Sequence, residues 1–321
     1  MPEIRRVAIL DDYQGVARRY ADWSTLPDGA RPTVFTEPLG GSEDVIAALE
    51  PFDVVVAMRE RTAFPAAVID RLPHLRLLVT TGPANAAIDV AAARRRGIVV
   101  SGTRGAGLIP TAELTWGLIH ALARSIPAED RGVREGAWQR TVGRDLHGAR
   151  LGVIGLGSVG THVARVGLAF GMDVVAWSAH LDAEHARAVG VTPVDKRELL
   201  AMSDVVTIHL KLSARTTGLL GRDDLALMRP DSLLVNTSRA PIVDEEALLA
   251  ALHAGTIGGA GLDVHSTEPL PADSPWRTAP RTVLTPHLGY VTAGTYDIFY
   301  SDALEDILAY AAGEPIRVVA P

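Results

Sequence analysis

Short apolar runs rich in Val, Ile and Leu recur along the chain, and Ala- and Leu-rich patterns with helical spacing fill the intervals between them. The first series of runs lies at residues 6–10, 33–36, 53–58, 75–80 and 98–101. Alternation of β-branched runs with helical patterns is typical of βαβ units, which assemble a parallel sheet. The pattern therefore predicts an α/β domain in the first part of the chain.

A second alternating series follows the helical pattern at residues 111–124, which begins just after Pro110. Its runs lie at residues 150–154, 173–177, 204–210, 232–237, 261–264 and 282–285. Six strands are enough for a complete dinucleotide-binding sheet. The last helical pattern, at residues 292–311, is too long for a loose tail, so we expect it to return to the first domain. The predicted domains are residues 1–100 with 289–321, and residues 101–288.

Composition excludes several classes of protein. The 321 residues are 47% hydrophobic and include no cysteine, which excludes disulfide scaffolds, thiolate zinc sites and cysteine nucleophiles. The formal charge of −7 offers no general surface to a polyanion, and the basic run at residues 94–96 precedes a glycine, as the end of a helix does. No apolar run is long enough to cross a bilayer, and the first residues lack the layout of a signal peptide. We expect a cytoplasmic protein that binds neither nucleic acid nor membrane and holds no metal.

A G-x-G-x-x-G motif lies between an apolar run and an apolar helical pattern, with its glycines at Gly155, Gly157 and Gly160. In a dinucleotide-binding turn the first glycine permits the tight turn, the second lets the backbone approach the pyrophosphate, and the third lets helix and strand pack closely. The N–H groups of Ser158 and Val159 would then face the phosphates at the positive end of the helix. A turn with a purely structural purpose is the alternative.

The strand predicted at residues 173–177 is followed by Ser178, Ala179 and His180. A sheet that selects NAD normally offers Asp or Glu to the ribose hydroxyls at about this point. Because no acidic residue is available here, the usual barrier to a 2′-phosphate is missing, and both NAD and NADP stay open as cofactors. His180 is the nearest side chain that can carry positive charge, and a surface histidine without such a role is the alternative.

Polar residues follow three later predicted strands, in Asn-Thr-Ser-Arg at 236–239, Glu-Pro-Leu-Pro at 268–271 and Pro-His-Leu-Gly at 286–289. With the glycine motif, these segments resemble the D-2-hydroxyacid dehydrogenase family in order and spacing, over essentially the whole chain. The resemblance implies a flavodoxin-like substrate domain, a Rossmann cofactor domain, and a site in the cleft between them. It also implies NAD(P)-dependent, reversible hydride transfer between the cofactor and a small 2-oxo or 2-hydroxy acid.

The resemblance assigns substrate binding to Arg239, and it assigns both catalysis and substrate contact to His287, with Glu268 as its acid partner. Asp263 matches the residue that holds the nicotinamide carboxamide. The chemistry fits, because a guanidinium donates to a carboxylate and to the oxyanion that develops beside it. A carboxylate beside a histidine favours the protonated ring, which can deliver a proton to the carbonyl oxygen. Taken singly, an ion-paired arginine, a loop glutamate and a core histidine are the more ordinary interpretations.

The resemblance also implies a wider set of cofactor contacts. His209 matches the family's His-x-Pro-x-Thr segment, although Lys211 and Ser213 replace its proline and threonine. The full set is Thr81, Gly155, Gly157, Ser158, Val159, Gly160, Ser178, His209, Leu210, Thr237, Ser238, Arg239, Asp263, His287 and Gly289.

On the substrate side, the segment around Gly82 resembles the loop whose backbone amides hold the substrate carboxylate, so Gly82 is the expected donor. Arg59 lies where the family has a substrate-facing loop, and a salt bridge to Glu60 is an equal alternative. Residues 131–150, with Trp138, resemble the arm by which family members clasp a second subunit. The resemblance therefore implies a homodimer.

Two other functions share this fold. Formate dehydrogenase is disfavoured because that relative pairs its histidine with Gln, whereas Glu268 is present here. A dinucleotide-sensing scaffold or corepressor stays open, because its distinguishing surfaces cannot be read from a sequence. Consumption of NAD(P)H in the presence of 2-oxo acids would separate an enzyme from such a sensor.

Overall fold

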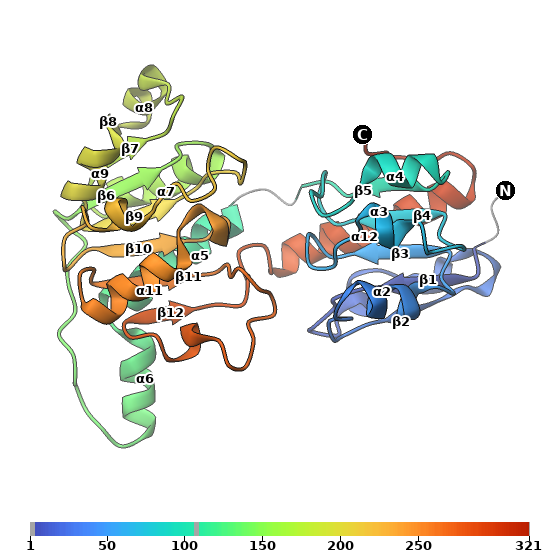
Figure 1. Ribbon diagram of the computed structural model, residues 1–321, viewed down its shortest axis with the longest axis horizontal. Coiled ribbons are helices and arrows are strands. Elements are labelled where there is room, and N and C mark those ends of the chain that lie inside the picture. The colour runs from blue at the N-terminus through green and yellow to red at the C-terminus, as the bar shows by residue number, and fades with distance from the viewer. Residues whose placement is uncertain (1–3, 106–108, 321) are drawn as a thin grey trace. The chain divides into compact units, whose positions relative to one another are not determined.

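The computed structural model describes residues 4–105 and 109–320, and the chain divides into two compact units (Figure 1). The first unit is Met1–Gly107 with Thr292–Pro321, and the second is Leu108–Val291. The sequence places the domain boundaries at residues 100 and 289, a few residues from these. Residues 1–3, 106–108 and 321 belong to the predicted domains but lie outside the described residues.

The first unit contains a five-stranded sheet in the order β2-β1-β3-β4-β5, and every pair of neighbours is parallel. Its strands are β1 (Arg6–Ile9), β2 (Arg31–Val34), β3 (Val54–Ala57), β4 (Leu77–Thr80) and β5 (Val99–Gly102). The order reverses between β1 and β3, which is the predicted flavodoxin-like arrangement. Each strand begins and ends within two residues of its predicted bounds.

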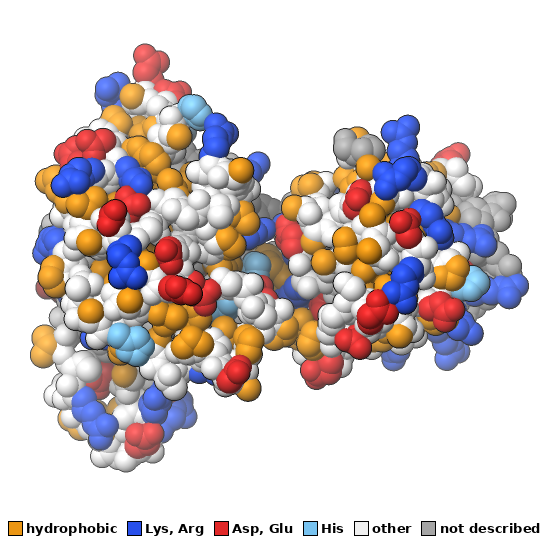
Figure 2. Space-filling view, viewed as in Figure 1, with side chains coloured by type: hydrophobic (Ala, Val, Ile, Leu, Met, Phe, Trp, Pro, Cys, Tyr) orange, Lys and Arg blue, Asp and Glu red, His pale blue; other side chains and the backbone are white. Residues whose placement is uncertain are grey.

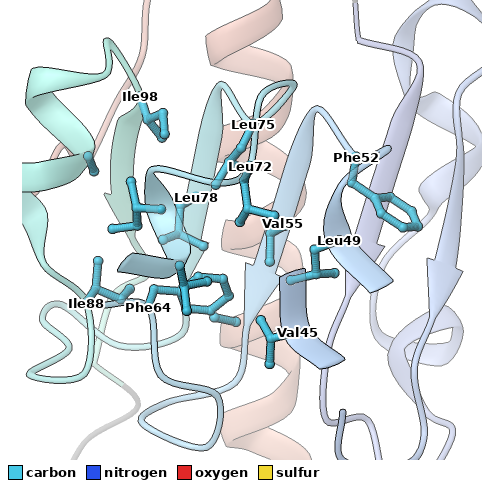
Figure 3. Packing of buried hydrophobic residues seen from close by; sticks show 14 of the residues in the cluster. Val45, Leu49, Phe52, Val55, Phe64, Leu72, Leu75, Leu78, Ile88 and Ile98 are labelled. Carbon is cyan, nitrogen blue, oxygen red and sulfur yellow. The ribbon is translucent and has the colours of Figure 1, made fainter. Parts of the chain in front are cut away.

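The first unit contains five α-helices among its described residues. They are α1 (Ala17–Tyr20), α2 (Ser42–Leu49), α3 (Ala66–Ile69), α4 (Val90–Arg95) and α12 (Ala293–Ala311). Val45 and Leu49 of α2 share one buried cluster with Val55 and Leu78 of the sheet (Figure 3). Each such side chain contributes about 1.5–3 kcal/mol through burial. Because α12 contacts α1, β4 and β5, the last helix completes the first unit.

The basic run at residues 94–96 forms the end of α4, as predicted. Arg94 and Arg95 occupy its last turn, and Arg96 is its C-cap. The partial negative charge at the carboxyl end of a helix favours such residues there. The structure therefore accounts for this run by helix termination.

The second unit contains a seven-stranded parallel sheet among the described residues, in the order β12-β11-β10-β9-β6-β7-β8. Its strands are β6 (Arg150–Ile154), β7 (Asp173–Trp177), β8 (Thr192–Pro193), β9 (Val205–Ile208), β10 (Leu233–Asn236), β11 (Gly259–Leu262) and β12 (Thr282–Leu284). The six predicted strands are present in the Rossmann arrangement, with the reversal between β6 and β9. The sequence does not predict β8, because two residues ending in a proline form no strand pattern and suit only a sheet edge.

Helices cover both faces of the second sheet (Figure 1). The helices of this unit are α5 (Ile109–Ala123), α6 (Ile126–Arg134), α7 (Ser158–Ala169), α8 (Ala183–Val189), α9 (Lys196–Met202), α10 (Arg222–Leu225) and α11 (Glu245–Ala254). Leu151 and Val153 of β6 pack with α5 and α7, whereas Ile154 packs with α9 and α11. Successive strand residues point to opposite faces, so a sheet covered on both sides needs apolar residues at consecutive positions.

Acidic and basic side chains are intermixed over the face of each unit that Figure 2 shows. In residues 4–105 and 109–320, no helix combines the length and the apolar character that crossing a bilayer requires. Even α12, with 19 residues, carries Asp297, Asp302, Glu305 and Asp306.

Candidate active site

One row of paired residues marks the edge of the second sheet at which the predicted site residues lie. Ile154 of β6 pairs with Ile208 of β9, which pairs with Asn236 of β10. Asn236 pairs in turn with Leu262 of β11, and Leu262 pairs with Leu284 of β12. Open parallel sheets bind ligands beyond the carboxyl ends of their strands. The residues that follow this row are the glycine motif, His209, Arg239, Asp263 and His287.

The three glycines of the motif have three different surroundings, and a side chain is sterically excluded at two of them. Gly155 has φ +95°, and a Cβ there would lie 2.5 Å from the carbonyl oxygen of His209. A Cβ on Gly160 would collide with the carbonyl oxygen of Gly155, so this glycine lets α7 pack close to β6. A Cβ on Gly157 would meet no atom within 4 Å. Gly157 therefore leaves open space above the backbone, where a ligand can approach closely.

The amino end of α7 supplies donors beside that space. Gly157 is the N-cap of α7 and has no side-chain cap, and its carbonyl oxygen accepts the first helical hydrogen bond from Thr161 N–H at 2.8 Å. The N–H groups of Ser158, Val159 and Gly160 precede that bond and have no acceptor within the helix. Together with the helix dipole they form an anion site that fits a pyrophosphate.

The carboxyl end of β7 lacks an acidic side chain and carries a pair of basic ones. Ser178 follows the strand, and its carbonyl oxygen accepts the N–H of Leu181 in a turn that contains His180. Arg215 lies in the segment between β9 and α10, yet its Nη1 donates to Nε2 of His180 at 3.2 Å. Sequence reasoning missed Arg215, because it considered only residues that follow β7 directly. The strand order could have indicated this residue. β7 and β9 flank β6, so the segments that follow β7 and β9 leave the same edge of the sheet.

His209 supports the glycine turn from the end of β9. Its N–H donates to the carbonyl oxygen of Ile154 at 2.8 Å, and its own carbonyl oxygen lies against Gly155. Burial lowers the pKa of His209 to about 3, so the ring is neutral, and its Nε2 lies 2.9 Å from the Thr207 hydroxyl. Leu210 also packs at Gly155. In this structure both predicted cofactor contacts shape the turn itself.

Thr237, Ser238 and Arg239 follow β10. The Thr237 hydroxyl lies 2.9 Å from the hydroxyl of Thr115, and the Ser238 hydroxyl donates to the carbonyl oxygen of Ile208 at 2.7 Å. These bonds tie the end of β10 to α5 and to β9. The half-buried Arg239 donates from Nη1 to the carbonyl oxygen of Ser238 at 2.8 Å, which holds the guanidinium beside the strand end.

Asp263 is fully buried and fixes the loop that carries His287. Its Oδ1 accepts the Thr285 hydroxyl at 2.6 Å and the N–H of Leu288 at 2.7 Å, and its Oδ2 accepts the N–H of Gly289 at 2.8 Å. Burial raises the pKa of Asp263, although these hydrogen bonds oppose the shift. The structure thus gives Asp263 a positioning role, and a carboxamide contact would use its remaining lone pairs. The Gly289 amide, a predicted cofactor contact, is engaged by this carboxylate.

His287 and Glu268 are brought together from separate loops. Nδ1 of His287 lies 2.7 Å from Oε2 of Glu268, while Oε1 of Glu268 accepts the N–H of His265 at 2.9 Å. Burial alone would raise the pKa of Glu268, but the hydrogen bond and charge of His287 outweigh burial and lower this pKa. The His287 side chain is 19% exposed, and because Nδ1 contacts Glu268, Nε2 is the ring nitrogen that this pair leaves unused. His287 has φ +57°, a conformation that Asp263 holds by binding the two following amides.

Arg59 of the first unit follows β3 with φ +52°. Its N–H donates to the Thr81 hydroxyl at 2.9 Å, and its Nη1 donates to the Thr81 carbonyl oxygen at 3.0 Å. Its Nη2 lies 3.5 Å from the Glu60 carboxylate, which is the salt bridge left open by the sequence. The guanidinium is thus already anchored within the first unit, beside the end of β4.

Gly82 and Thr81, predicted to contact substrate and cofactor, both make hydrogen bonds within the first unit in this structure. The Gly82 N–H, expected to hold the substrate carboxylate, donates to the Thr103 hydroxyl at 2.7 Å. The buried Thr81 hydroxyl donates to the sulfur of Met58 at 3.4 Å, so its side chain is also engaged. Gly82 has φ +91°, and a Cβ there would collide with Nη1 of Arg59. In this structure Gly82 makes room for Arg59, and its amide is not a free donor.

These features define a class of protein, the dinucleotide-binding α/β proteins. The strand order of the parallel sheet reverses at β6, and the glycine turn leads into the amino end of α7. Arginine, glutamate and histidine side chains, which are suited to acid–base chemistry, lie beyond the strand ends. The family model described as D-isomer specific 2-hydroxyacid dehydrogenase, NAD binding domain, matches residues 116–289, more than half of the chain. The chain belongs to this family, which confirms the resemblance seen in the sequence. A nicotinamide dinucleotide is accordingly the cofactor of this domain.

Individual relatives agree with this result. D-3-phosphoglycerate dehydrogenase of Archaeoglobus fulgidus is 38% identical over 277 residues, which cover 86% of this chain and 52% of that protein. The chain thus spans about half the length of such relatives. Glyoxylate reductase of Korarchaeum cryptofilum is 35% identical over 78% of this chain and 77% of its own. The crystal structure of phosphoglycerate oxidoreductase from Vibrio cholerae is 36% identical, with a TM-score of 0.91 over 97% of this chain and 100% of that chain.

Proposed function

We propose that the chain catalyses reversible hydride transfer between NAD(P) and a small 2-oxo or 2-hydroxy acid. The observation that carries the proposal is the 2.7 Å contact between His287 Nδ1 and Glu268 Oε2. This pair follows the same sheet edge as Arg239 and the glycine turn. An acid–base pair, a guanidinium and a dinucleotide turn at one edge are the groups that 2-oxo acid reduction needs.

Each group has a distinct task. When bound, the cofactor supplies or accepts the hydride at C2 of the acid. The amino end of α7, at Ser158 and Val159, holds its pyrophosphate. Arg239 binds the carboxylate of the acid and stabilises negative charge that develops on the neighbouring oxygen. His287 delivers a proton from Nε2 to that oxygen, and in the oxidation direction it removes the same proton.

Glu268 keeps His287 in the form that reduction requires. With Nδ1 bound to the carboxylate, the ring is held in one orientation and its positive charge is compensated. Asp263 fixes the backbone on either side of this ring position through Thr285 and Leu288. The proton donor His287 is therefore already oriented before substrate binds.

Steady-state absorbance of NADH and NADPH tests the proposal with glyoxylate, hydroxypyruvate, phenylpyruvate and other 2-oxo acids. We expect cofactor oxidation with at least one acid, and its loss in a His287→Ala variant that still binds the cofactor. If the wild-type protein binds the cofactor tightly but oxidises it with no acid on the panel, the dinucleotide-sensing scaffold becomes the better assignment.

We also propose that the chain acts as a homodimer through the arm at residues 131–150. Trp138 is 77% exposed and Val142 is 99% exposed on this segment, which follows the projecting helix α6 (Figure 1). Large apolar side chains at such exposure are typical of an interface. Light scattering of the wild type and of a Trp138→Ser variant tests this. A wild-type monomer would end the proposal.

A further inference from the structure

The carboxyl end of β7 carries a side-chain pair that the proposed reaction does not use. Nη1 of Arg215 donates to Nε2 of His180 at 3.2 Å, across 35 residues of sequence. A ring nitrogen that accepts a hydrogen bond from a guanidinium is unprotonated, so this contact needs a neutral imidazole. His180 therefore orients Arg215, and the other N–H groups of the guanidinium stay available for a ligand.

Arg215 sits on a turn that hydrogen bonds hold in place. The Ser213 carbonyl oxygen accepts the N–H groups of Thr216 at 3.0 Å and of Thr217 at 2.9 Å. The Thr216 hydroxyl accepts the N–H of Ser213 and donates to the carbonyl oxygen of Lys211, both at 2.8 Å. A backbone anchored on both sides of Arg215 presents the side chain from a fixed base, which lowers the entropy lost on binding.

The positive charge of Arg215 is not compensated by an acidic side chain. Among residues 4–105 and 109–320, no carboxylate lies within ion-pair distance of this exposed guanidinium. The acidic residue nearest to His180 in the chain is Asp182, and its carboxylate instead accepts the N–H groups of Glu184 and His185 at the start of α8. A cation oriented by a neutral neighbour and left without a counter-ion is suited to an anionic ligand.

We propose that Arg215, positioned by His180, binds the 2′-phosphate of NADP and makes this chain selective for NADP. The inference rests on the proposed function, and it names the cofactor of that function. The adenosine ribose lies at the end of the second strand of a Rossmann sheet, which here is β7. Ser178 stands there in place of a carboxylate, so the acidic side chain that would repel the phosphate at this position is missing. The guanidinium fork matches phosphate geometry and needs no arginine directly after β7.

Nucleotide binding tests this without turnover. Calorimetric titration compares adenosine 2′,5′-bisphosphate, which carries the 2′-phosphate, with 5′-AMP, which lacks it. We expect the wild-type protein to bind the bisphosphate at least about tenfold more tightly than AMP, the scale of one charged hydrogen bond. In R215A the affinity for the bisphosphate should fall by about that factor, while the affinity for AMP changes less than about twofold.

A matched control and a double-mutant cycle sharpen the test. Arg187 is an exposed arginine on the neighbouring helix α8, so R187A removes the same charge without touching His180 and should leave both affinities unchanged. H180A should weaken bisphosphate binding by a smaller factor than R215A. Adding H180A to R215A should then have no further effect, because His180 acts only through Arg215.

The unfavourable outcomes are distinct. A wild-type ratio near one, a ratio unchanged in R215A, or an equal loss of both ligands in R215A would each overturn the inference. If the protein turned over no 2-oxo acid but still bound the bisphosphate at least about tenfold more tightly than AMP, the proposed function would be overturned instead. The inference on NADP recognition would then stand.

Discussion

Oε2 of Glu268 lies 2.7 Å from Nδ1 of His287. The other carboxylate oxygen of Glu268 accepts the N–H of His265, and Asp263 accepts the two backbone N–H groups that follow His287. The Glu268 carboxylate cannot turn away without breaking its bond to His265, and the backbone that carries His287 is held by Asp263. This arrangement keeps the carboxylate within hydrogen-bond distance of Nδ1 of the ring.

Replacing Glu268 by Gln should move the pH profile of 2-oxo acid reduction toward acid. The glutamate pKa is lowered by the hydrogen bond and charge of His287 against the effect of burial, so carboxylate and imidazolium stabilise one another. Gln cannot compensate a positive charge on the neighbouring ring, so we expect reduction to decline earlier as pH rises. Measurement of kcat/KM from pH 5 to 9 checks this, with Glu246→Gln on α11 as the control. A profile that stays in place would contradict the pairing.

His287→Ala should reduce kcat by about a hundredfold or more and leave cofactor affinity nearly unchanged. The reason is that the variant removes the proton donor but not the turn at Gly157 or the end of α7. Single-wavelength kinetics and cofactor titration measure the two effects separately. His253→Ala, at an exposed position in the last turn of α11, is the control. Wild-type kcat in His287→Ala would refute the assignment.

Arg239→Lys should raise KM and lower kcat together. Lysine keeps the charge but loses the planar fork, so the contact with the carboxylate and the stabilisation of the oxyanion both weaken. Steady-state kinetics with the best 2-oxo acid measure both constants, and Arg187→Lys serves as the control. Unchanged constants in Arg239→Lys would show that another residue binds the acid.

Ser178→Asp should shift the preference for NADH over NADPH by about 1–3 kcal/mol in the ratio of kcat/KM values, the scale of one charged contact. A carboxylate at the end of β7 accepts ribose hydroxyls and repels a 2′-phosphate. Ala188→Asp places the same charge on α8, away from the strand end, and should shift the ratio far less. If kcat/KM of the wild type were already a hundredfold or more higher with NADH than with NADPH, a residue other than Ser178 would determine recognition of the ribose.

Asp306→Asn should flatten the dependence of stability on pH. Burial raises the pKa of Asp306 from its ordinary value of 3.8 to about 7, although Arg317 opposes the shift. The folded protein thus keeps a proton that the unfolded chain loses, and stability falls as pH rises from about 4 to about 7. Urea unfolding at pH 5 and pH 8 should show a smaller loss for the variant than for the wild type. Asp297→Asn, exposed on the same helix, should keep the wild-type slope.

The sequence predicted the elements of the site whose signal is local. The glycine motif could be interpreted position by position, because a tight turn, a close backbone approach and close helix packing each require glycine at a fixed place between a strand and a helix. These places are Gly155, Gly157 and Gly160. The ends of β10, β11 and β12 could be placed on one edge, because parallel strands align their carboxyl ends. The reversed strand orders followed from the family resemblance.

Other features depend on residues that only tertiary structure brings together. Arg215 contacts His180 because the strands that precede the two residues, β9 and β7, flank β6 in the sheet. The spacing of the two residues along the chain does not predict this contact. The Gly82 amide donates to Thr103, which directly follows β5, the neighbouring strand of the sheet. Lys211 and Ser213 depart from the family pattern, and the structure shows instead that their segment forms the turn under Arg215.

The return of α12 to the first unit has a consequence for how the molecule is made. Ser101 of β5 donates to the carbonyl oxygen of Ile316, and the Gly102 N–H donates to that of Arg317 at 3.0 Å, so the fifth strand is completed by residues near the other end of the chain. Every residue of the second unit, Leu108–Val291, is synthesised before these partners. The first unit, whose synthesis begins earliest, therefore receives the last hydrogen bonds of β5 only after the whole second unit has been synthesised.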